Sequence, residues 1–377
     1  MRLATSSVRR FVAASSAILI VVVAGLSTPA AGADPELWQK RDAAVARAVE
    51  YLAKNQTPEG AFTPQAGPAV TALVVTGLLH NGRTVDDPMI AKSLKYLQTF
   101  VQEDGGIYLK DSNYRNYETS ISMQAFSAAN ADGRYAALLK GAERFVRELQ
   151  WDESEGKDKS DPTYGGAGYG KSKRPDLSNT SFFIDALKAA GAGPDDEGLK
   201  KALVFVSRCQ NLETEHNTTE FSAKNPDGGF YYTPAAGGTS QAGKTETGGL
   251  RSYASMTYAG LKSMIYAGLG PDDQRVKAAL EWLKKNYTLD QNPGMGDAGL
   301  FYYYHTFAKA LDAMGQPTFT DAAGTAHDWR GELAAELVRR QRPDGSFTND
   351  NARWMEGDPN LVTGYALLTL AFLKPAK

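Results

Sequence analysis

Apolar and small side chains recur along this chain with the three- and four-residue spacing of helices that bury one face. Six segments carry an aromatic residue or leucine followed by leucine or valine, and five of them have a small residue three positions before this pair. The pairs are Tyr51-Leu52, Tyr96-Leu97, Phe145-Val146, Phe205-Val206, Trp282-Leu283 and Leu337-Val338. We interpret these segments as six copies of a first helix, so the chain is built from repeats.

Each predicted first helix runs into a turn that contains glycine. Five copies place a glutamine just after the apolar pair, and the fifth copy has Tyr287 there; the glutamines are Gln56, Gln102, Gln150, Gln210 and Gln341. In the clearest copy, Gln341 is followed by Arg-Pro-Asp-Gly-Ser-Phe. Proline fixes φ, aspartate bonds to its own backbone and glycine accepts a positive φ, so this string ends a helix.

A second helix is predicted after each turn. Five copies carry a threonine six residues before a small or short side chain, namely Thr71, Thr119, Thr180, Thr257 and Thr363, and the fifth copy has Tyr304 at this place. The last predicted helix, 361–373, is strongly apolar and needs a partner, which the first copy supplies if the repeats close into a ring. We therefore predict an all-α fold, a single (α/α)6 toroid over residues 34–377 with the second helices inside.

The first 33 residues have the pattern of a secretory signal peptide. Arg2, Arg9 and Arg10 precede an apolar run over residues 11–26, and small residues that end in Ala33 follow it. This order predicts cleavage after Ala33 and a secreted or periplasmic protein, with an uncleaved membrane anchor as the alternative.

Composition narrows the function. The 377 residues are 42% hydrophobic and 22% charged, which excludes a disordered chain and a polytopic membrane protein. Forty-one basic and 43 acidic residues give a net charge of −2, so nucleic acid is not a predicted partner. The single cysteine, Cys209, excludes a disulfide framework and every multi-cysteine metal site. We predict neither a metal nor a cofactor.

Two further motifs have structural explanations. The acidic pairs 86–87, 195–196 and 272–273 could hold magnesium for a diphosphate, but their place in the repeat favours capping of the next first helix. The string from Gly238 to Thr245 fits the phosphate-loop pattern letter for letter. That motif binds nucleotide only between a strand and a helix, and no helical pattern follows here, so we predict no nucleotide binding.

The glutamine–glycine–aromatic unit followed by a threonine-containing helix resembles the repeat of squalene/hopene cyclases and protein prenyltransferase β subunits. The resemblance covers nearly all of the chain after the signal peptide. It implies the toroid, and it implies that the repeat glutamines tie neighbouring helices together. The catalytic residues of the family carry over poorly, because the chain has no Asp-x-Asp-Asp string and no zinc-ligand set.

The resemblance and the ring model place all glycine turns at one mouth, where the third and fourth copies carry long loops, 151–173 and 213–253. Aromatic side chains near this mouth could stack on a sugar, line a terpenoid pocket or simply hold the loops to the ring. The predicted ligand-binding residues are Tyr164, Tyr169, Tyr231, Tyr232, Tyr253, Tyr302, Tyr303 and Trp354.

The candidate catalytic residues are the polar groups near the same mouth. They are Glu118, His305, Asp176 and Arg251. An acid that is buried among aromatic rings has a raised pKa and can act as a general acid. A structural role competes for each of the four, most directly for Asp176, which precedes Thr180 at a helix-capping distance.

Three functions remain open at this point. The first is a cyclase-like toroid that binds a hydrophobic isoprenoid, with isomerase or lyase chemistry if it is an enzyme. The second is a carbohydrate-active toroid, a polysaccharide lyase or hydrolase. The third is a non-catalytic binding or scaffold toroid. The predicted partner is a hydrophobic small molecule or a glycan, with room for a peripheral membrane contact.

Overall fold

The computed structural model describes residues 35–170 and 174–375. The predicted signal peptide lies outside the described residues. Within them, none of the helices combines the length and the apolar character that crossing a bilayer requires.

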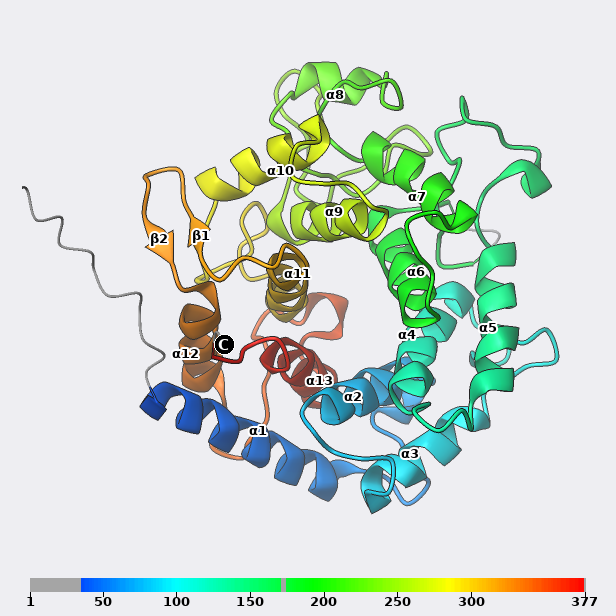
Figure 1. Ribbon diagram of the computed structural model, residues 1–377, viewed down its shortest axis with the longest axis vertical. Helices are drawn as coiled ribbons and strands as arrows, with labels where there is room; N and C mark the ends of the chain where they lie inside the picture. The colour runs from blue at the N-terminus through cyan, green and yellow to red at the C-terminus, as the bar shows by residue number, and fades with distance from the viewer. Residues whose placement is uncertain (1–34, 171–173, 376–377) are drawn as a thin grey trace, which may run out of the picture. The chain divides into compact units, whose positions relative to one another are not determined.

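Twelve helices form two concentric layers that alternate along the chain (Figure 1). The outer helices are α1 (Pro35–Asn55), α3 (Pro88–Gln98), α5 (Ala136–Glu148), α7 (Glu197–Arg208), α10 (Gln274–Lys285) and α12 (Trp329–Arg340). The inner helices are α2 (Ala69–His80), α4 (Arg115–Ala128), α6 (Leu177–Ala189), α9 (Ala254–Tyr266), α11 (Leu300–Ala313) and α13 (Pro359–Leu370). Each predicted first helix is an outer helix and each predicted second helix is an inner one.

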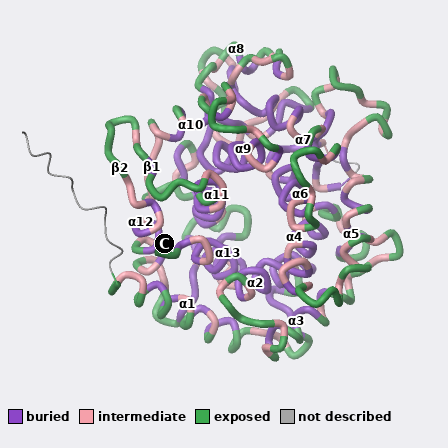
Figure 2. Tube along the Cα trace, viewed as in Figure 1, coloured by how far each residue is buried: buried purple, intermediate pink, exposed green. Residues whose placement is uncertain are grey.

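The ring closes between its last and first repeats. Helix α13 packs along α2, and α1 packs against α12. Glycines make this approach possible, because a Cβ on Gly77 of α2 would lie 2.9 Å from the Cβ of Leu367. The inner helices are buried along most of their length, whereas the outer layer is exposed on its outward side (Figure 2). The predicted (α/α)6 toroid, with the second helices inside, is confirmed.

The repeat glutamines join each turn to the next outer helix. In four copies the side-chain amide donates to the carbonyl of its own turn glycine and to a carbonyl of the following outer helix. The second acceptors are the carbonyls of Met89 for Gln56, Gly198 for Gln150, Arg275 for Gln210 and Ala44 for Gln341, each at 2.8–2.9 Å. Gln341 therefore links the sixth repeat back to the first. Gln102 differs, because it donates to Phe100 and Tyr108 within its own loop.

The repeat threonines hold the turns against the inner helices. In five copies the threonine hydroxyl accepts the backbone N–H of a residue in its own turn, at 2.9–3.1 Å. The pairs are Phe62–Thr71, Ile107–Thr119, Ala167–Thr180, Phe230–Thr257 and Phe347–Thr363. A buried backbone donor that lacked this acceptor would destabilise the fold, so the position requires a hydroxyl.

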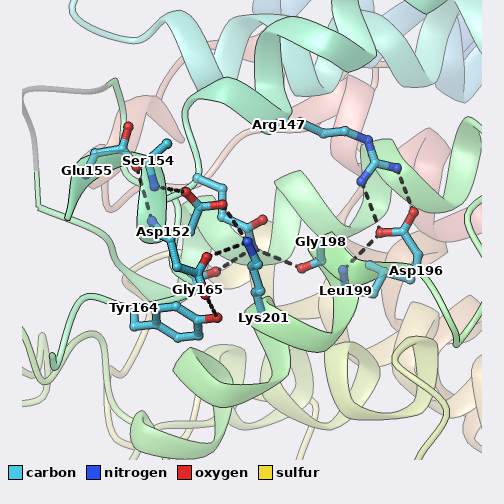
Figure 3. A network of polar contacts seen from close by, with 12 residues as sticks. Arg147, Asp152, Ser154, Glu155, Tyr164, Gly165, Asp196, Gly198, Leu199 and Lys201 are labelled. Atoms are coloured by element: carbon cyan, nitrogen blue, oxygen red, sulfur yellow. Dashed lines mark hydrogen bonds and ion pairs between the residues drawn. The ribbon is translucent and has the colours of Figure 1, made fainter. Parts of the chain in front are cut away.

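The junction between the third and fourth repeats carries additional ion pairs (Figure 3). Asp196 caps α7 through the backbone N–H of Leu199 and also pairs with Arg147 of α5 at 2.7 Å. Lys201 reaches Asp152 in the preceding loop at 2.8 Å. Asp87 and Asp273 cap α3 and α10 in the same way, so the capping interpretation of the acidic pairs is confirmed.

The remaining elements are short and lie in the connections. They are α8 (Glu220–Lys224), the antiparallel pair β1 (Phe319–Thr320) and β2 (Ala326–His327), and the 3-10 turns Pro64–Ala66, Glu153–Glu155 and Arg353–Met355. The string from Gly238 to Thr245 lies in a described loop between Thr233 and Leu250 and does not lead directly into a helix, because α9 begins only at Ala254.

Candidate functional site

An axial cavity of about 620 Å³ opens at the N-terminal ends of the inner helices. Its size is that of a pocket for a drug-sized ligand. Each of the six inner helices contributes the residue two positions before its repeat threonine, or before Tyr304 in the fifth repeat. These residues are Ala69, Tyr117, Ser178, Ser255, Tyr302 and Leu361. The periodicity of the sequence therefore sets the lining of the cavity.

Four aromatic side chains from four inner helices line the cavity and contact one another in a closed circle, which we call the aromatic collar: Tyr117, Phe182, Tyr302 and Tyr365. Successive ring centroids lie 5.0, 6.1 and 6.0 Å apart. The hydroxyl oxygens of Tyr365 and Tyr117 are 3.4 Å apart and close the circle. Two of these ring contacts are edge-to-face and the Phe182–Tyr302 contact is tilted; together they fix the rings, so the collar offers a rigid apolar surface.

Glu118 is the buried acid of this cavity that the sequence predicted. Glu118 lies in the first turn of α4, and the residue is only 4% exposed. Its carboxylate accepts the backbone N–H of Leu109 at 2.8 Å and the hydroxyl of Ser112 at 2.7 Å. Burial raises the pKa of Glu118, although both hydrogen bonds lower it in part. The direction of this shift favours the protonated form of the carboxyl group.

A second buried acid, Glu356, was missed by the sequence analysis. Its carboxylate accepts the backbone N–H groups of Phe301 and Tyr302 at the start of α11 and the side-chain amide of Asn349. Burial raises its pKa, again against these hydrogen bonds. Because its oxygens satisfy the end of α11, Glu356 supports the cavity wall, and its sequence context contained no motif that would have indicated this.

The rim of the cavity is apolar and strained. Leu109, Tyr114, Trp354 and Met355 all line the opening, and each is 45–53% exposed. Trp354 and Met355 have φ values of 56° and 65°, in the left-handed region that such residues rarely adopt. Strain of this kind gathers at ligand-contacting segments, so we include residues 353–356 in the candidate site.

Five of the predicted ligand-binding residues come together here: Tyr169, Tyr232, Tyr253, Tyr302 and Trp354 all line the cavity. The other three do not line it. Their hydroxyl groups donate elsewhere, from Tyr164 to Glu153, from Tyr231 to the carbonyl of Arg208 and from Tyr303 to the carbonyl of Thr288. Tyr231 and Tyr303 each join a loop to a helix of the ring, whereas the contact of Tyr164 lies within the third loop (Figure 3).

Three of the four candidate catalytic residues, Arg251, His305 and Asp176, do not line the cavity. Arg251 is exposed, and its Nε donates to the carbonyl of Lys244 within the fourth loop. His305 is buried on α11 beside a separate, much smaller cavity. Burial lowers the pKa of His305 to about 3, so this imidazole is neutral and cannot act as a cationic acid.

Asp176 lies behind the cavity wall rather than in it. It is the N-cap of α6 and accepts both the backbone and the side-chain N–H of Asn179. Burial raises its pKa to about 6, and hydrogen bonds from Asn179 and Tyr232, a residue that lines the cavity, oppose the shift. Asp176 therefore positions Tyr232 and the start of α6.

Asp176→Asn should change the pH dependence of stability. The pKa of this carboxyl is raised on folding, so its contribution is fully present below about pH 4 and is lost as the pH rises through 6. Asparagine keeps the cap but does not ionise. We expect the variant to gain stability relative to the wild type between pH 4 and 7, by about 3 kcal/mol at most. Urea unfolding at four pH values measures this.

The matched control is Asp273→Asn. Asp273 also caps a helix, but its hydrogen bond with Arg275 lowers its pKa. The stability that this carboxylate contributes is present above its unfolded pKa and is lost as the pH falls, so Asp273→Asn should be less stable than the wild type near neutral pH and its deficit should shrink in acid. Equal slopes for the two variants would contradict the explanation.

The charged groups of the cavity are carboxylates. Asp111, Glu118 and Glu356 line it, and no Lys, Arg or His occurs among its described lining residues. Within residues 35–170 and 174–375, no three His, Cys, Asp or Glu side chains are grouped so as to hold a metal ion.

Solved structures with a similar fold extend over nearly the whole chain at low sequence identity. The type II terpene cyclase MstE from Scytonema is 15% identical, covers 88% of this chain and 98% of its own, and has a TM-score of 0.50. A polysaccharide lyase is 12% identical, covers 89% and 97%, and has a TM-score of 0.54. A possible member of the GH105 family from Salmonella enterica serovar Paratyphi A is 11% identical, covers 88% and 93%, and has a TM-score of 0.52.

No family model matches the chain, and no curated protein matches it in sequence. At these identities the three structures show the α/α toroid fold alone. The chain therefore shares its fold with a type II terpene cyclase and with a polysaccharide lyase.

Proposed function

We propose that this protein binds a hydrophobic, isoprenoid-like small molecule in the axial cavity. The observation that carries the proposal is the aromatic collar. Tyr117, Phe182, Tyr302 and Tyr365 surround the axis with ring faces and edges, while Ala69, Val70 and Leu73 of α2 add aliphatic surface. Apolar surface that is removed from water here would stabilise a hydrocarbon ligand by about 25 cal/mol per Å².

If the protein is an enzyme, Glu118 is the group that we propose as its acid. A neutral carboxyl can protonate an alkene carbon: its O–H bond breaks as a C–H bond forms, and a carbocation and a carboxylate result. Loss of a proton from a neighbouring carbon back to the carboxylate completes an isomerisation. The raised pKa of Glu118 and its place beside Tyr117 of the collar support this role.

The N-terminal segment supports a further proposal, that the mature chain works outside the cytoplasm. The expected result of expression with this segment is export and cleavage after Ala33.

A carbohydrate ligand is the second candidate, and specific residues favour it. Carboxylates and tyrosine rings line the same cavity, and sugars stack on aromatic faces. An oligosaccharide would use Glu118 together with Asp111 at the rim, whereas an isoprenoid would use Glu118 together with the collar.

Farnesol binding tests the proposed function. We expect saturable binding of farnesol to the protein by isothermal titration calorimetry, and at least a tenfold weaker affinity for Ser178→Phe, whose ring would fill the cavity beside Tyr302. Ser160→Phe, in an exposed loop, is the matched control and should bind as the wild type does. Binding of cellohexaose or chitohexaose with no binding of farnesol would support the carbohydrate candidate instead.

A further inference from the structure

A buried cluster of ionisable groups lies next to the aromatic collar and has no part in the proposed function. Phe182 and Tyr302 line both the axial cavity and a second cavity of about 10 Å³. The other walls of the small cavity include Asp185, Lys262, His305 and Lys309, from α6, α9 and α11. The cluster therefore lies in the interior of the ring.

Its charges do not balance. Asp185 pairs with Lys262 at 2.6 Å through one carboxylate oxygen and with Lys309 at 2.8 Å through the other. Lys262 and Asp185 have side-chain exposures of 3% and 4%, and that of Lys309 is 13%. Two ammonium groups thus share one carboxylate, and an uncompensated charge in a buried position is costly.

Asp185 is the acceptor of the small cavity, and both of its oxygens are engaged by the lysines; three other polar groups there keep hydrogen-bonding capacity that the protein does not use. Lys309 has three N–H groups, and its contact with Asp185 uses one of them. The hydroxyl oxygen of Ser181 accepts a hydrogen bond from Lys262 at 2.7 Å, so its own proton is directed elsewhere. The Nδ1 of His305 is buried and has no hydrogen-bond partner among the described residues, and the residue is 5% exposed.

We propose that the small cavity binds a monovalent monatomic anion, of which chloride is the physiological example, between Lys309, Ser181 and His305. The anion balances the second ammonium group and accepts the three donors that the protein leaves available. A cavity of about 10 Å³ holds one water-sized particle, which excludes polyatomic anions such as sulfate and phosphate. Chloride is somewhat larger than water, and the partly exposed end of Lys309 can provide the additional room.

Anomalous diffraction at long X-ray wavelength tests this site directly, because chloride scatters anomalously and water does not. Crystals of the mature protein grown in sodium chloride should show a peak between Lys309 Nζ, Ser181 Oγ and the His305 ring. Crystals grown in sodium gluconate should show none there. Density without an anomalous signal in the chloride crystals would mean that water occupies the cavity, and would overturn the proposal.

Thermal unfolding gives an independent measurement in solution. At constant ionic strength, replacement of gluconate by 100 mM chloride should raise the Tm of the wild type by about 2 °C, with saturation as binding becomes complete. Lys309→Met removes the additional cation and should abolish this increase. Lys277→Met, at a lysine on the exposed surface, is the matched control and should keep it.

Ser181→Ala serves if Lys309→Met does not fold, because it removes one donor and no charge. It should reduce the chloride-dependent rise by at least half. An equal rise in the wild type and in both cluster variants would show a general salt effect and would contradict a site. These outcomes do not depend on farnesol binding, so the anion site and the proposed function can fail separately.

Discussion

Asp185→Asn should destabilise the protein by about 3–5 kcal/mol, the usual cost of removing one partner from a buried ion pair. The carboxylate of Asp185 contacts Lys262 and Lys309 and is almost fully buried. Asparagine has nearly the same shape but no charge, so it leaves two ammonium groups together in the interior. Chemical denaturation at pH 7 measures the loss.

A second substitution separates charge from shape. Lys262→Met removes one ammonium group and keeps an unbranched stem, so the double variant Asp185→Asn, Lys262→Met should recover most of the stability. Asp132→Asn, at an exposed position, is the control and should change stability by no more than about 0.5 kcal/mol. A single variant as stable as the wild type would show that the lysines are neutral in the folded protein.

The stability lost in Asp185→Asn should also depend on pH in a predictable direction. Burial lowers the pKa of Lys262 to about 8, so the stability linked to this lysine is present above its unfolded pKa and is lost as the pH falls through 8. Without Asp185 the lysines should release their protons more readily. The deficit of Asp185→Asn should therefore shrink between pH 7 and 10.

The fold could be predicted from the sequence because the same contacts repeat. Each repeat threonine accepts a turn N–H, and four glutamines link their turn to the next outer helix. Gln102 shows the limit of this inference. It stands five residues after Leu97, whereas Gln56 stands four after Leu52, and the extra residue moves its amide into its own loop.

The site could be predicted only in part, because neighbouring residues point in different directions. Tyr302 and Tyr303 are adjacent on α11, and about 100° of helical rotation directs the first to the cavity and the second to the carbonyl of Thr288. Tyr231 and Tyr232 are likewise adjacent, in the loop before α9, and the first donates its hydroxyl to the carbonyl of Arg208 while the second lines the cavity.

The repeat pattern does indicate the collar residues that were not among the predicted ligand-binding residues. Tyr117, like Tyr302, stands two positions before the repeat threonine or its replacement, and all six residues at this position line the cavity. Tyr365 and Phe182 stand two positions after the threonine, one helical turn further along the same face. Glu356 has no such register, because it lies in a loop whose path the sequence does not determine.

Gly345→Ala should destabilise the protein by about 3 kcal/mol or more, since two costs add. Gly345 has a φ of +90°, and a Cβ there would lie 2.4 Å from the backbone oxygen of Arg47 on α1. The clash falls on the contact that joins the sixth repeat to the first. Methyl insertion cannot be relieved by a side-chain rotation, because the neighbouring atom belongs to the backbone.

Two other glycines allow the backbone strain and the steric clash at Gly345 to be measured separately. Gly82 has a φ of +88° with no atom within 4 Å of its Cβ position, so Gly82→Ala measures the backbone strain alone, about 1–2 kcal/mol. Gly60 repeats the full contact inside the ring, where its Cβ would lie 2.5 Å from the oxygen of Lys92. If the closing contact is equivalent to the internal ones, Gly345→Ala and Gly60→Ala should cost the same in urea unfolding, and both should exceed Gly82→Ala. An equal cost for Gly345→Ala and Gly82→Ala would mean that the turn at Gly345 moves away from α1 easily. The cavity wall formed by α13 and α2 would then be held by the packing of these two helices, with no contribution from the turn.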